Sequence, residues 1–385
     1  MIYNKFIDRE ISRLGMGCMR LPVGEDGRIN EELTEKMVDL AMKSGINYFD
    51  TAYPYHGGES ERVIGRCLSK YPRESYALAN KYPGHQVLES YDPAVIFEEQ
   101  LEKCGVEYFD YYLLHNVNEK SIGVYKNEEY GILEYFLRQK ELGRIRHLGF
   151  STHGALPNFK EFLDYAGDKM EFCQIQLNYL DWTMQDAKTK YEMLTEMNIP
   201  VVVMEPLRGG KLATADLGEE YRGRSASLAL RFVADLPGVK VILSGMSNME
   251  QLQDNISTFE NESPLTDAER EMLLSAAEGM KKDVPCTACR YCTEGCPAHL
   301  DIPMLLEAYV EASYVPSLML GIRLESLEAD KKHPKNCIGC KKCEKMCPQN
   351  IKISALMAEF AEIAARIPRW DDVCRERAAA AKKRK

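Results

Sequence analysis

Eight short apolar runs, separated by stretches of helical periodicity, occupy the chain up to about residue 262, and this alternation constrains the fold most strongly. The runs are RLGMGCM (13–19), INYFDTA (46–52), YALANK (76–81), DYYLLH (110–115), RHLGFS (146–151), FCQIQLN (172–178), PVVVME (200–205) and VKVILSG (239–245). In an intervening segment, Leu33, Met37, Leu40 and Ala41 recur at helical spacing. Near-continuous apolar strands joined by helices predict a parallel sheet that is buried on both faces.

Eight strand–helix units in this length predict an α/β fold, a (β/α)8 TIM barrel. The alternative is an open, doubly wound sheet. A G-x-G-x-x-G sequence directly after the first strand is typical of the dinucleotide-binding form of that fold. No such sequence follows the first run here, so the pattern favours the barrel.

A second domain is predicted after about residue 280, where strand-like runs end. Helical spacing of apolar residues recurs over 302–310, 318–327 and 356–363. Residues 283–385 contain 17 Lys and Arg against 14 Asp and Glu, a net charge of +3, which leaves −13 for the rest of a chain whose total is −10. We therefore expect a barrel over 1–280 and a smaller helical domain over 281–385.

The helical domain contains the same cysteine spacing twice, CTACRYCTEGCP at 286–297 and CIGCKKCEKMCP at 337–348. Both runs fit C-x2-C-x2-C-x3-C-P, the bacterial ferredoxin pattern, and predict two [4Fe–4S] clusters. Structural zinc is the alternative, but it needs only four ligands in all. In two-cluster ferredoxins the fourth cysteine of each run ligates the other cluster. The expected ligand sets are therefore Cys286, Cys289, Cys292 with Cys347, and Cys337, Cys340, Cys343 with Cys296. The long helical spacer resembles that of α-helical dicluster ferredoxins.

Three titratable residues close consecutive apolar runs: Asp50, Lys81 and His115. Catalytic residues of barrel enzymes lie at the C-terminal ends of the strands, so we expect these side chains to meet. Asp50 also opens the motif D-T-A-x-x-Y, which ends at Tyr55 and is followed by Gly57, Gly58 and Glu59. Because of these strand-end residues and this motif, the segment 1–262 resembles an aldo-keto reductase. The resemblance implies a catalytic tetrad of Asp50, Tyr55, Lys81 and His115. Tyr53 competes for the tyrosine position, and the family spacing favours Tyr55.

The resemblance implies an NAD(P)H-dependent reduction of an aldehyde or ketone to an alcohol, or the reverse. A tyrosine with a pKa of about 10 is a poor acid–base catalyst at neutral pH. Lys81 is expected to lower the pKa of Tyr55, because a nearby ammonium favours the phenolate. Asp50 would hold Lys81, and His115 would orient the carbonyl and share its developing charge.

The nicotinamide cofactor contacts follow from the same resemblance. Ser151 and Gln174 match positions that hold the carboxamide, and Thr152 stands where the family usually has Asn. NADPH-preferring relatives usually place Arg or Lys in the stretch that holds the adenosine, and none occurs over 246–251. NADH is therefore expected, unless Arg208 or Arg20 binds the 2′-phosphate. The complete set of expected cofactor contacts is Cys18, Met19, Asp50, Ser151, Thr152, Gln174, Pro206, Leu207, Gly209, Gly210, Gly245, Gln251 and Asn255.

Hydride transfer moves two electrons together, whereas a cluster moves one, so three interpretations stay open. The clusters are structural or regulatory beside a nicotinamide-dependent carbonyl reductase. Alternatively, they exchange electrons with a ferredoxin or flavoprotein partner. In the third interpretation the barrel is inactive and the protein is a redox sensor or electron carrier.

The net negative charge of the barrel part of the chain disfavours nucleic acid as a partner. The apolar runs are too short to cross a bilayer, and 13 cysteines without a signal sequence indicate a cytoplasmic protein.

Overall fold

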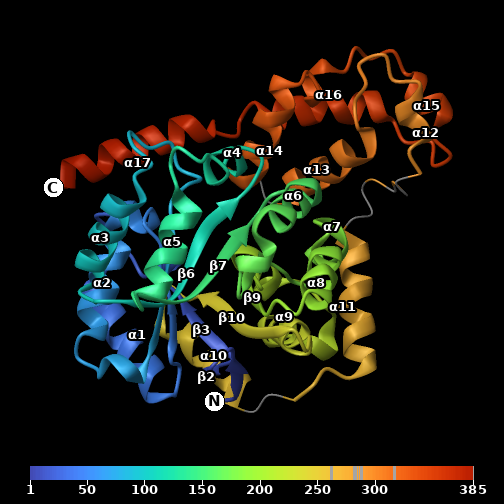
Figure 1. Ribbon diagram of the computed structural model, residues 1–385. Helices are drawn as coiled ribbons and strands as arrows, with labels where there is room; N and C mark the ends of the chain where they lie inside the picture. Colours follow the sequence, from blue (N-terminus) through green and yellow to red (C-terminus); the bar gives the residue numbers. More distant parts are fainter. Residues whose placement is uncertain (261–262, 281–283, 285, 287–288, 315–317, 385) are drawn as a thin grey trace. The chain divides into compact units, whose positions relative to one another are not determined.

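The computed structural model describes residues 1–384 except 261–262, 281–283, 285, 287–288 and 315–317. The chain forms two compact units (Figure 1). One contains Met1–Leu274 with Arg377–Lys385, and the other contains Ser275–Glu376. The predicted division into 1–280 and 281–385 stays a prediction, and each unit is described by itself.

The first unit is a closed barrel of eight parallel strands, so the predicted (β/α)8 fold is confirmed and the open-sheet alternative is wrong (Figure 1). Every predicted strand is present, and each pair of adjacent strands in the barrel is parallel. The strands are β3 (Leu14–Gly17), β4 (Tyr48–Asp50), β5 (Ala77–Tyr82), β6 (Phe109–Val117), β7 (Ile145–Thr152), β8 (Cys173–Gln176), β9 (Val201–Met204) and β10 (Val239–Gly245).

A short antiparallel hairpin, β1 (Tyr3–Phe6) and β2 (Arg9–Ser12), precedes the barrel and was not predicted. Phe6 is fully buried and stacks on Tyr111 with ring centroids 4.6 Å apart. The hairpin residues share a core cluster with the first residues of several barrel strands, so they close the N-terminal end of the barrel. The functional rim therefore lies at the opposite end.

Helices surround the barrel strands, and the first of them begins with a side-chain cap. The Asn30 side chain accepts a hydrogen bond from the Leu33 N–H at the start of the first helix. The main helices of this unit are α1 (Glu31–Lys43), α2 (Glu59–Leu68), α3 (Pro93–Cys104), α5 (Ile132–Glu141), α6 (Leu156–Ala166), α8 (Ala187–Glu196), α9 (Ser225–Ala234) and α10 (Met249–Glu260). Shorter ones are α4 (Ile122–Tyr125) and α7 (Asp181–Met184), and α11 (Asp267–Met280) runs across the boundary between the units.

The described residues of the second unit contain helices and no strand, as predicted. Its elements are α12 (Tyr291–Glu294), α13 (Ile302–Tyr314), α14 (Leu318–Ala329), α15 (Lys342–Met346), α16 (Ile353–Ala364) and the first part of α17 (Trp370–Arg384). Helix α13 packs against α16, where the Tyr309 and Phe360 rings meet edge to face at 5.9 Å. Helix α12 packs against α15, which brings the two cysteine motifs together.

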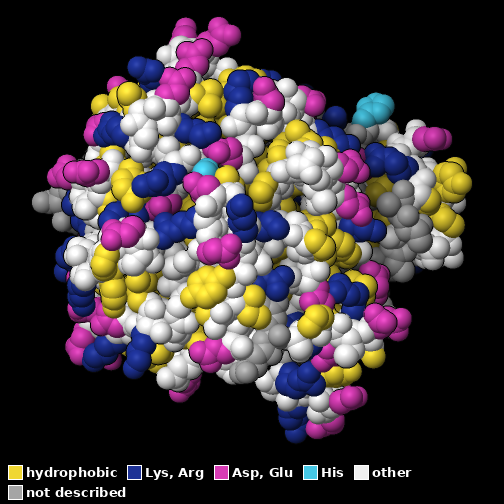
Figure 2. Space-filling model, turned by 60° about the horizontal axis from the view of Figure 1, so that its bottom comes forward, with side chains coloured by type: hydrophobic (Ala, Val, Ile, Leu, Met, Phe, Trp, Pro, Cys, Tyr) yellow, Lys and Arg dark blue, Asp and Glu magenta, His cyan; other side chains and the backbone are white. Residues whose placement is uncertain are grey.

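The surface carries both charges. On the face drawn in Figure 2, basic and acidic side chains are interspersed over the barrel unit. Within the described part of the chain, no helix combines the length and the apolar character needed to cross a bilayer.

Candidate active site and cofactor sites

Three of the predicted catalytic side chains meet at the C-terminal end of the barrel. Lys81 Nζ lies 2.5 Å from Asp50 Oδ1 and also donates a hydrogen bond to the Thr51 carbonyl at 2.8 Å. Its distance to the Tyr55 hydroxyl is 3.4 Å. Lys81 is fully buried and Asp50 almost so. The strand ends thus give a continuous chain of contacts from carboxylate to ammonium to phenol.

The charges of this chain are set by burial and by contact. Burial disfavours a charged amine, but the Asp50 carboxylate and the Tyr55 oxygen outweigh it and raise the pKa of Lys81. Burial also raises the pKa of Asp50, and the ammonium 2.5 Å away opposes this shift and keeps the pair ionic. Burial raises the pKa of Tyr55 and Lys81 lowers it, with a net increase. The expected lowering is therefore outweighed, because desolvation of the phenolate has a larger effect on the pKa of Tyr55 than the Lys81 ammonium has. Tyr55 is held as a neutral phenol.

The other tyrosine of the motif points into a different environment. The Tyr53 hydroxyl donates a hydrogen bond to Glu99 Oε2 at 3.1 Å, and Lys103 Nζ lies 4.3 Å from the centre of its ring. Burial and the Glu99 carboxylate raise the pKa of Tyr53. The structure therefore places Tyr55, and not Tyr53, beside Lys81.

His115 lies beside Tyr55 as a neutral imidazole. The two rings meet edge to face with centroids 5.9 Å apart. Burial lowers the pKa of His115 well below its usual value, and neighbouring His85 and Lys81 add to this. His115 Nδ1 is buried without a hydrogen-bond partner in the described part of the chain. A neutral imidazole can donate a hydrogen bond to a substrate oxygen without adding a positive charge.

His85 is a site residue that sequence reasoning missed. Its ring centroid lies 4.2 Å from that of His115, and burial lowers its pKa to about 3. Gln86 Nε2 lies 2.7 Å from His85 Nε2. His85 stands four residues after Lys81 in an irregular loop, so no periodicity marks it. The only feature of the sequence that could have pointed to His85 is its nearness to Lys81 at the end of β5.

A buried polar network holds the backbone of Lys81. The Asn80 side chain accepts from the Lys81 N–H at 2.8 Å, and Gln100 donates to the Lys81 carbonyl at 3.1 Å. Both amides donate to the same oxygen of Glu61, each at 2.8 Å. Glu61 is fully buried, and Lys103 Nζ lies 3.5 Å from its other oxygen. Helices α2 and α3 thus fix the strand that carries Lys81.

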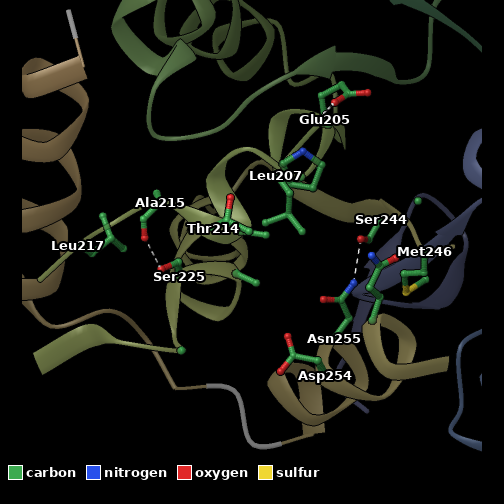
Figure 3. Close-up of a pocket in the computed structure, with 18 of the residues that line it drawn as sticks. Glu205, Leu207, Thr214, Ala215, Leu217, Ser225, Ser244, Met246, Asp254 and Asn255 are labelled. Atoms are coloured by element: carbon green, nitrogen blue, oxygen red, sulfur yellow. Dashed lines mark hydrogen bonds between the residues drawn. The ribbon is translucent and has the colours of Figure 1, made fainter. Parts of the chain in front are cut away.

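A cleft of about 640 Å³ opens among the loops that follow β9 and β10, the last two barrel strands (Figure 3). It brings together seven of the predicted cofactor contacts: Pro206, Leu207, Gly209, Gly210, Gly245, Gln251 and Asn255. Gly209 and Gly210 have φ values of +67° and +94°, which glycine adopts without strain. The same two loops form the phosphate site of many barrel enzymes. The cleft fits the phosphate and adenosine parts of a dinucleotide.

The expected carboxamide contacts lie on β7 and β8. Gln174 is buried, and its Oε1 has no hydrogen-bond partner among the described residues, so it can accept from an amide. The Ser151 hydroxyl accepts from the Asn116 N–H at 2.8 Å and can still donate. The Thr152 hydroxyl donates to the Val117 carbonyl at 2.7 Å and accepts from Gly154 N–H at 3.0 Å. The Thr152 hydroxyl proton is thus used within the barrel.

The two expected contacts after the first barrel strand differ from each other. Cys18 is fully buried, and burial followed by the Asp50 carboxylate raises the pKa of its thiol. Cys18 is therefore a neutral thiol packed beside the Asp50–Lys81 pair. Met19 is 52% exposed.

The cleft also contains polar residues that were not predicted. Asp254 and Ser244 line it, and Asn255 Nδ2 donates to Ser244 Oγ at 2.8 Å (Figure 3). Arg20, which was considered above as a ligand of the 2′-phosphate, lines the cleft too, with Nη2 3.5 Å from a Glu205 carboxylate oxygen. Ser244 lies within β10 and Asp254 lies in α10, and no sequence pattern distinguishes either of them as a site residue.

Of the two arginines considered for a 2′-phosphate, one is already engaged. Arg208 is buried and forms an ion pair with Asp181, itself fully buried. Arg20 is nearly half exposed at the mouth of the cleft.

In the second unit, two small cavities separate the eight motif cysteines into the expected groups. One is lined by Cys286, Cys289, Cys292 and Cys347, and the other by Cys296, Cys337, Cys340 and Cys343. No three His, Cys, Asp or Glu side chains in the described residues converge closely enough to bind a single metal ion. A four-iron cluster instead needs four thiolates spread around a cage. The donor set in each cavity fits such a cluster.

Comparisons with known proteins support both parts. The aldo/keto reductase family matches residues 13–225 and 213–278. A 4Fe-4S dicluster domain matches residues 285–352. The C-terminal region is therefore an iron–sulfur domain of the ferredoxin type.

Similar proteins span most of the barrel. The chain is 24% identical over 327 residues to the NADH-specific methylglyoxal reductase of Escherichia coli, covering 71% of this chain and 97% of that protein. It is 25% identical over 286 residues to L-galactose dehydrogenase of Arabidopsis thaliana, covering 64% and 84%. The solved structure of aldo-keto reductase AKR11C1 from Bacillus halodurans, in its holo form, is 25% identical with a TM-score of 0.60, covering 72% of this chain and 96% of that one. From its barrel, its strand-end residues and these matches, the chain belongs to the aldo/keto reductase family, to which it joins a C-terminal 4Fe-4S dicluster domain.

Proposed function

We propose that this protein reduces the carbonyl group of a small aldehyde or ketone to an alcohol, or catalyses the reverse, with NAD(P)H. The observation that carries the proposal is the chain of contacts from Asp50 through Lys81 to Tyr55, with neutral His115 beside it. The nicotinamide supplies the hydride to the carbonyl carbon when it is bound. The protein's own side chains supply the proton, stabilise the developing charge and orient the carbonyl.

Tyr55 donates the proton that the carbonyl oxygen needs. It is a neutral phenol, because burial keeps its pKa above the ordinary value. As the proton leaves, negative charge develops on the phenolic oxygen, and Lys81 Nζ at 3.4 Å stabilises it. Asp50 holds Lys81 in place and balances its charge in the buried site. His115 donates a hydrogen bond to the same carbonyl oxygen and so orients it.

The cleft after β9 and β10 would hold the phosphates and the adenosine, and Gln174 and Ser151 the carboxamide. We propose NADH as the preferred cofactor. Asp254 places a carboxylate in the cleft, which would accept a hydrogen bond from a ribose hydroxyl and repel a 2′-phosphate. Arg208 is occupied by Asp181, which leaves Arg20 as the competing phosphate ligand. The NADH-specific relative supports this choice.

Two [4Fe–4S] clusters would occupy the two cysteine cavities, each taking three thiolates from one motif and one from the other. Cross-ligation ties segments some fifty residues apart, and we assign the clusters a structural or regulatory role in the carbonyl reaction. Thiols of this kind remain reduced in the cytoplasm, where we place the protein.

The test is steady-state oxidation of NADH and NADPH by the cluster-loaded protein with no redox partner present. Methylglyoxal is the first substrate, followed by a panel of small aldehydes and ketones. Turnover without a partner supports the proposal. Nicotinamide binding with no turnover on any carbonyl contradicts it, and favours an electron-transfer or sensing role.

A second function is favoured by one observation: each cysteine cavity has one cysteine that reaches the surface, Cys289 in one and Cys340 in the other. Ligands at the surface allow a cluster to exchange electrons with another protein. This function, electron exchange with a ferredoxin or flavoprotein, is compatible with carbonyl reduction by the barrel.

A further inference from the structure

The surroundings of the two cysteine cavities differ in charge. Beside the cavity of Cys286, the guanidinium of Arg290 is 2.7 Å from Asp301 and so is neutralised locally. Three exposed lysines lie within five residues of the sequence beside the cavity of Cys337: Lys341, Lys342 and Lys345. None of the three lies within ion-pair distance of a carboxylate in the part of the chain that the structure describes. We call these three residues the lysine rim.

The geometry of α15 directs the rim outward. Lys345 and Met346 lie three and four positions after Lys342, so both share one side of the helix with it. Cys343 is buried and lines the cavity. The acidic residue of this helix, Glu344, is turned to the protein, since its Oε1 accepts from the Ser354 N–H at 3.0 Å and from the Ser354 hydroxyl. Lys341 interacts electrostatically with Glu344, but in the described part of the chain none of the three lysines forms an ion pair with it.

Apolar side chains accompany the rim. Ile338 is 69% exposed although it lines the cavity of Cys337, and Met346 is 55% exposed. Cys340, between Ile338 and Lys341, is itself exposed. An isolated exposed apolar side chain needs no explanation, but here apolar side chains and unpaired cations lie around a candidate metal ligand. Interfaces in general combine an apolar centre with a polar rim.

We infer that an acidic one-electron carrier protein docks on the lysine rim with Ile338 and Met346, and exchanges electrons with the cluster held by Cys296, Cys337, Cys340 and Cys343. This inference rests on the two clusters of the proposed function. One electron leaves the reduced carrier and enters the oxidised cluster, and no bond is made or broken. An acidic partner fits because the unpaired lysines attract it, and such steering raises association rates by about 10- to 1,000-fold. The cavity of Cys286, with its paired arginine, is not the entry point.

The experiment uses the full-length, cluster-loaded protein and a reduced acidic [2Fe–2S] ferredoxin of the plant type as the probe. Anaerobic stopped-flow absorbance follows reduction of the clusters at low and high salt. The second-order rate constant should fall steeply as salt rises. The Lys342→Glu/Lys345→Glu variant should react at least about tenfold more slowly at low salt. The matched control is Lys331→Glu/Lys332→Glu, which makes the same charge change at exposed residues outside the motif and should stay within about twofold.

Two further measurements locate the docking site. Reduced methyl viologen, a small cation, should reduce the charge-reversed protein at least as fast as the unaltered protein, which shows that the clusters are intact. Ile338→Ser should slow the ferredoxin reaction, whereas Tyr291→Ser, an exposed apolar residue of the other motif, should not. The inference is overturned if both double variants slow equally, if Tyr291→Ser is the slow variant, or if viologen reduces the clusters and ferredoxin does not. Iron analysis comes first, and carbonyl turnover is not the readout, so failure of the carbonyl reaction leaves this test unaffected.

Discussion

Lys81 Nζ lies 2.5 Å from Asp50 Oδ1, and both side chains are removed from solvent. A buried cation is tolerated only when it is paired, and breaking such a pair by removing one charge costs about 3–5 kcal/mol. The contact therefore contributes to stability, and in the proposed mechanism it also serves catalysis.

Asp50→Asn should impair both stability and carbonyl reduction. We expect a loss of carbonyl reduction of about 10²-fold or more, because an unpaired Lys81 is driven toward the neutral amine by burial and no longer stabilises the Tyr55 oxygen. The activity that remains should rise with falling pH as Lys81 is protonated again. The measurement is kcat against pH with unfolding by urea in parallel. A variant with unchanged kcat would remove Asp50 from the mechanism.

Tyr55→Phe should abolish most carbonyl reduction while leaving nicotinamide binding intact. The hydroxyl donates the proton, and general acid catalysis contributes about 10²- to 10⁴-fold. Tyr53→Phe is the matched control, because its hydroxyl contacts Glu99 and not Lys81. It should retain kcat within about threefold, since it removes one partly exposed hydrogen bond. Single-turnover rates and nucleotide fluorescence titration check both variants. The assignment is wrong if Tyr53→Phe is the inactive one.

The strand pattern made much of this site predictable. Asp50, Lys81 and His115 each close an apolar run, and parallel strands of a barrel all end on one rim, so sequence order alone brings them together. The two cysteine motifs were predictable for a similar reason, since their spacing reflects the geometry of a cluster.

Other features depend on burial and packing, which the sequence does not contain. The net pKa shift of Tyr55 is one, because a nearby ammonium could be foreseen but the degree of enclosure could not. His85 and Asp254 are others, since the role of a residue in a loop, such as His85, or on a helix, such as Asp254 in α10, depends on where that element packs. The N-terminal hairpin was missed because its strands, YNKF and REIS, are mostly polar and form no apolar run, with Phe6 and Ile11 as the buried anchors.

Replacing one motif cysteine should remove one cluster and leave the other. Cys340→Ser should lower the iron content from about eight to about four per chain, and Cys289→Ser should do the same, because the two residues line different cavities. The double variant should lose nearly all iron. Cys67→Ser, at a buried thiol of α2, is the control and should keep all of it. Iron and labile sulfide are measured after anaerobic purification. Stoichiometric zinc without sulfide would refute the cluster assignment.

Asp254→Ser should shift the cofactor preference toward NADPH. The carboxylate lines the cleft, where it would accept a hydrogen bond from a ribose hydroxyl and repel a phosphate at the same position. Loss of one charged hydrogen bond weakens the binding of NADH by about 1.5–3 kcal/mol, which corresponds to roughly a tenfold or greater decrease in kcat/KM for NADH. Asp216→Ser, at another carboxylate that lines the cleft, is the control and should leave the ratio unchanged. A wild-type protein that already prefers NADPH strongly would overturn the assignment and point to Arg20.

The far end of the barrel should show a pH-dependent stability set by His147. Its Nε2 lies 2.8 Å from Asp8 on the hairpin turn, and its Nδ1 lies 3.0 Å from Glu171. Burial disfavours the charged ring, but the two carboxylates outweigh it and raise the pKa of His147. The protonated ring therefore stabilises the folded state fully below about pH 6.5, its pKa in the unfolded chain, and this contribution is lost as the pH rises through the higher folded value. Glu171, whose pKa is lowered to about 2, keeps its charge throughout this range.

His147→Gln should therefore destabilise the protein more at pH 6 than at pH 9, with a difference of about 1–2 kcal/mol, because hydrogen bonds to a charged group are lost only where the ring is charged. Urea unfolding of the barrel unit, followed by circular dichroism at a series of pH values, measures the difference between wild type and variant. Asp8→Asn should show the same trend at smaller size, since Asp8 is largely exposed and Glu171 still faces the ring. An equal loss of stability at both pH values would mean that His147 is neutral in the folded protein and only fills space between the hairpin and the barrel.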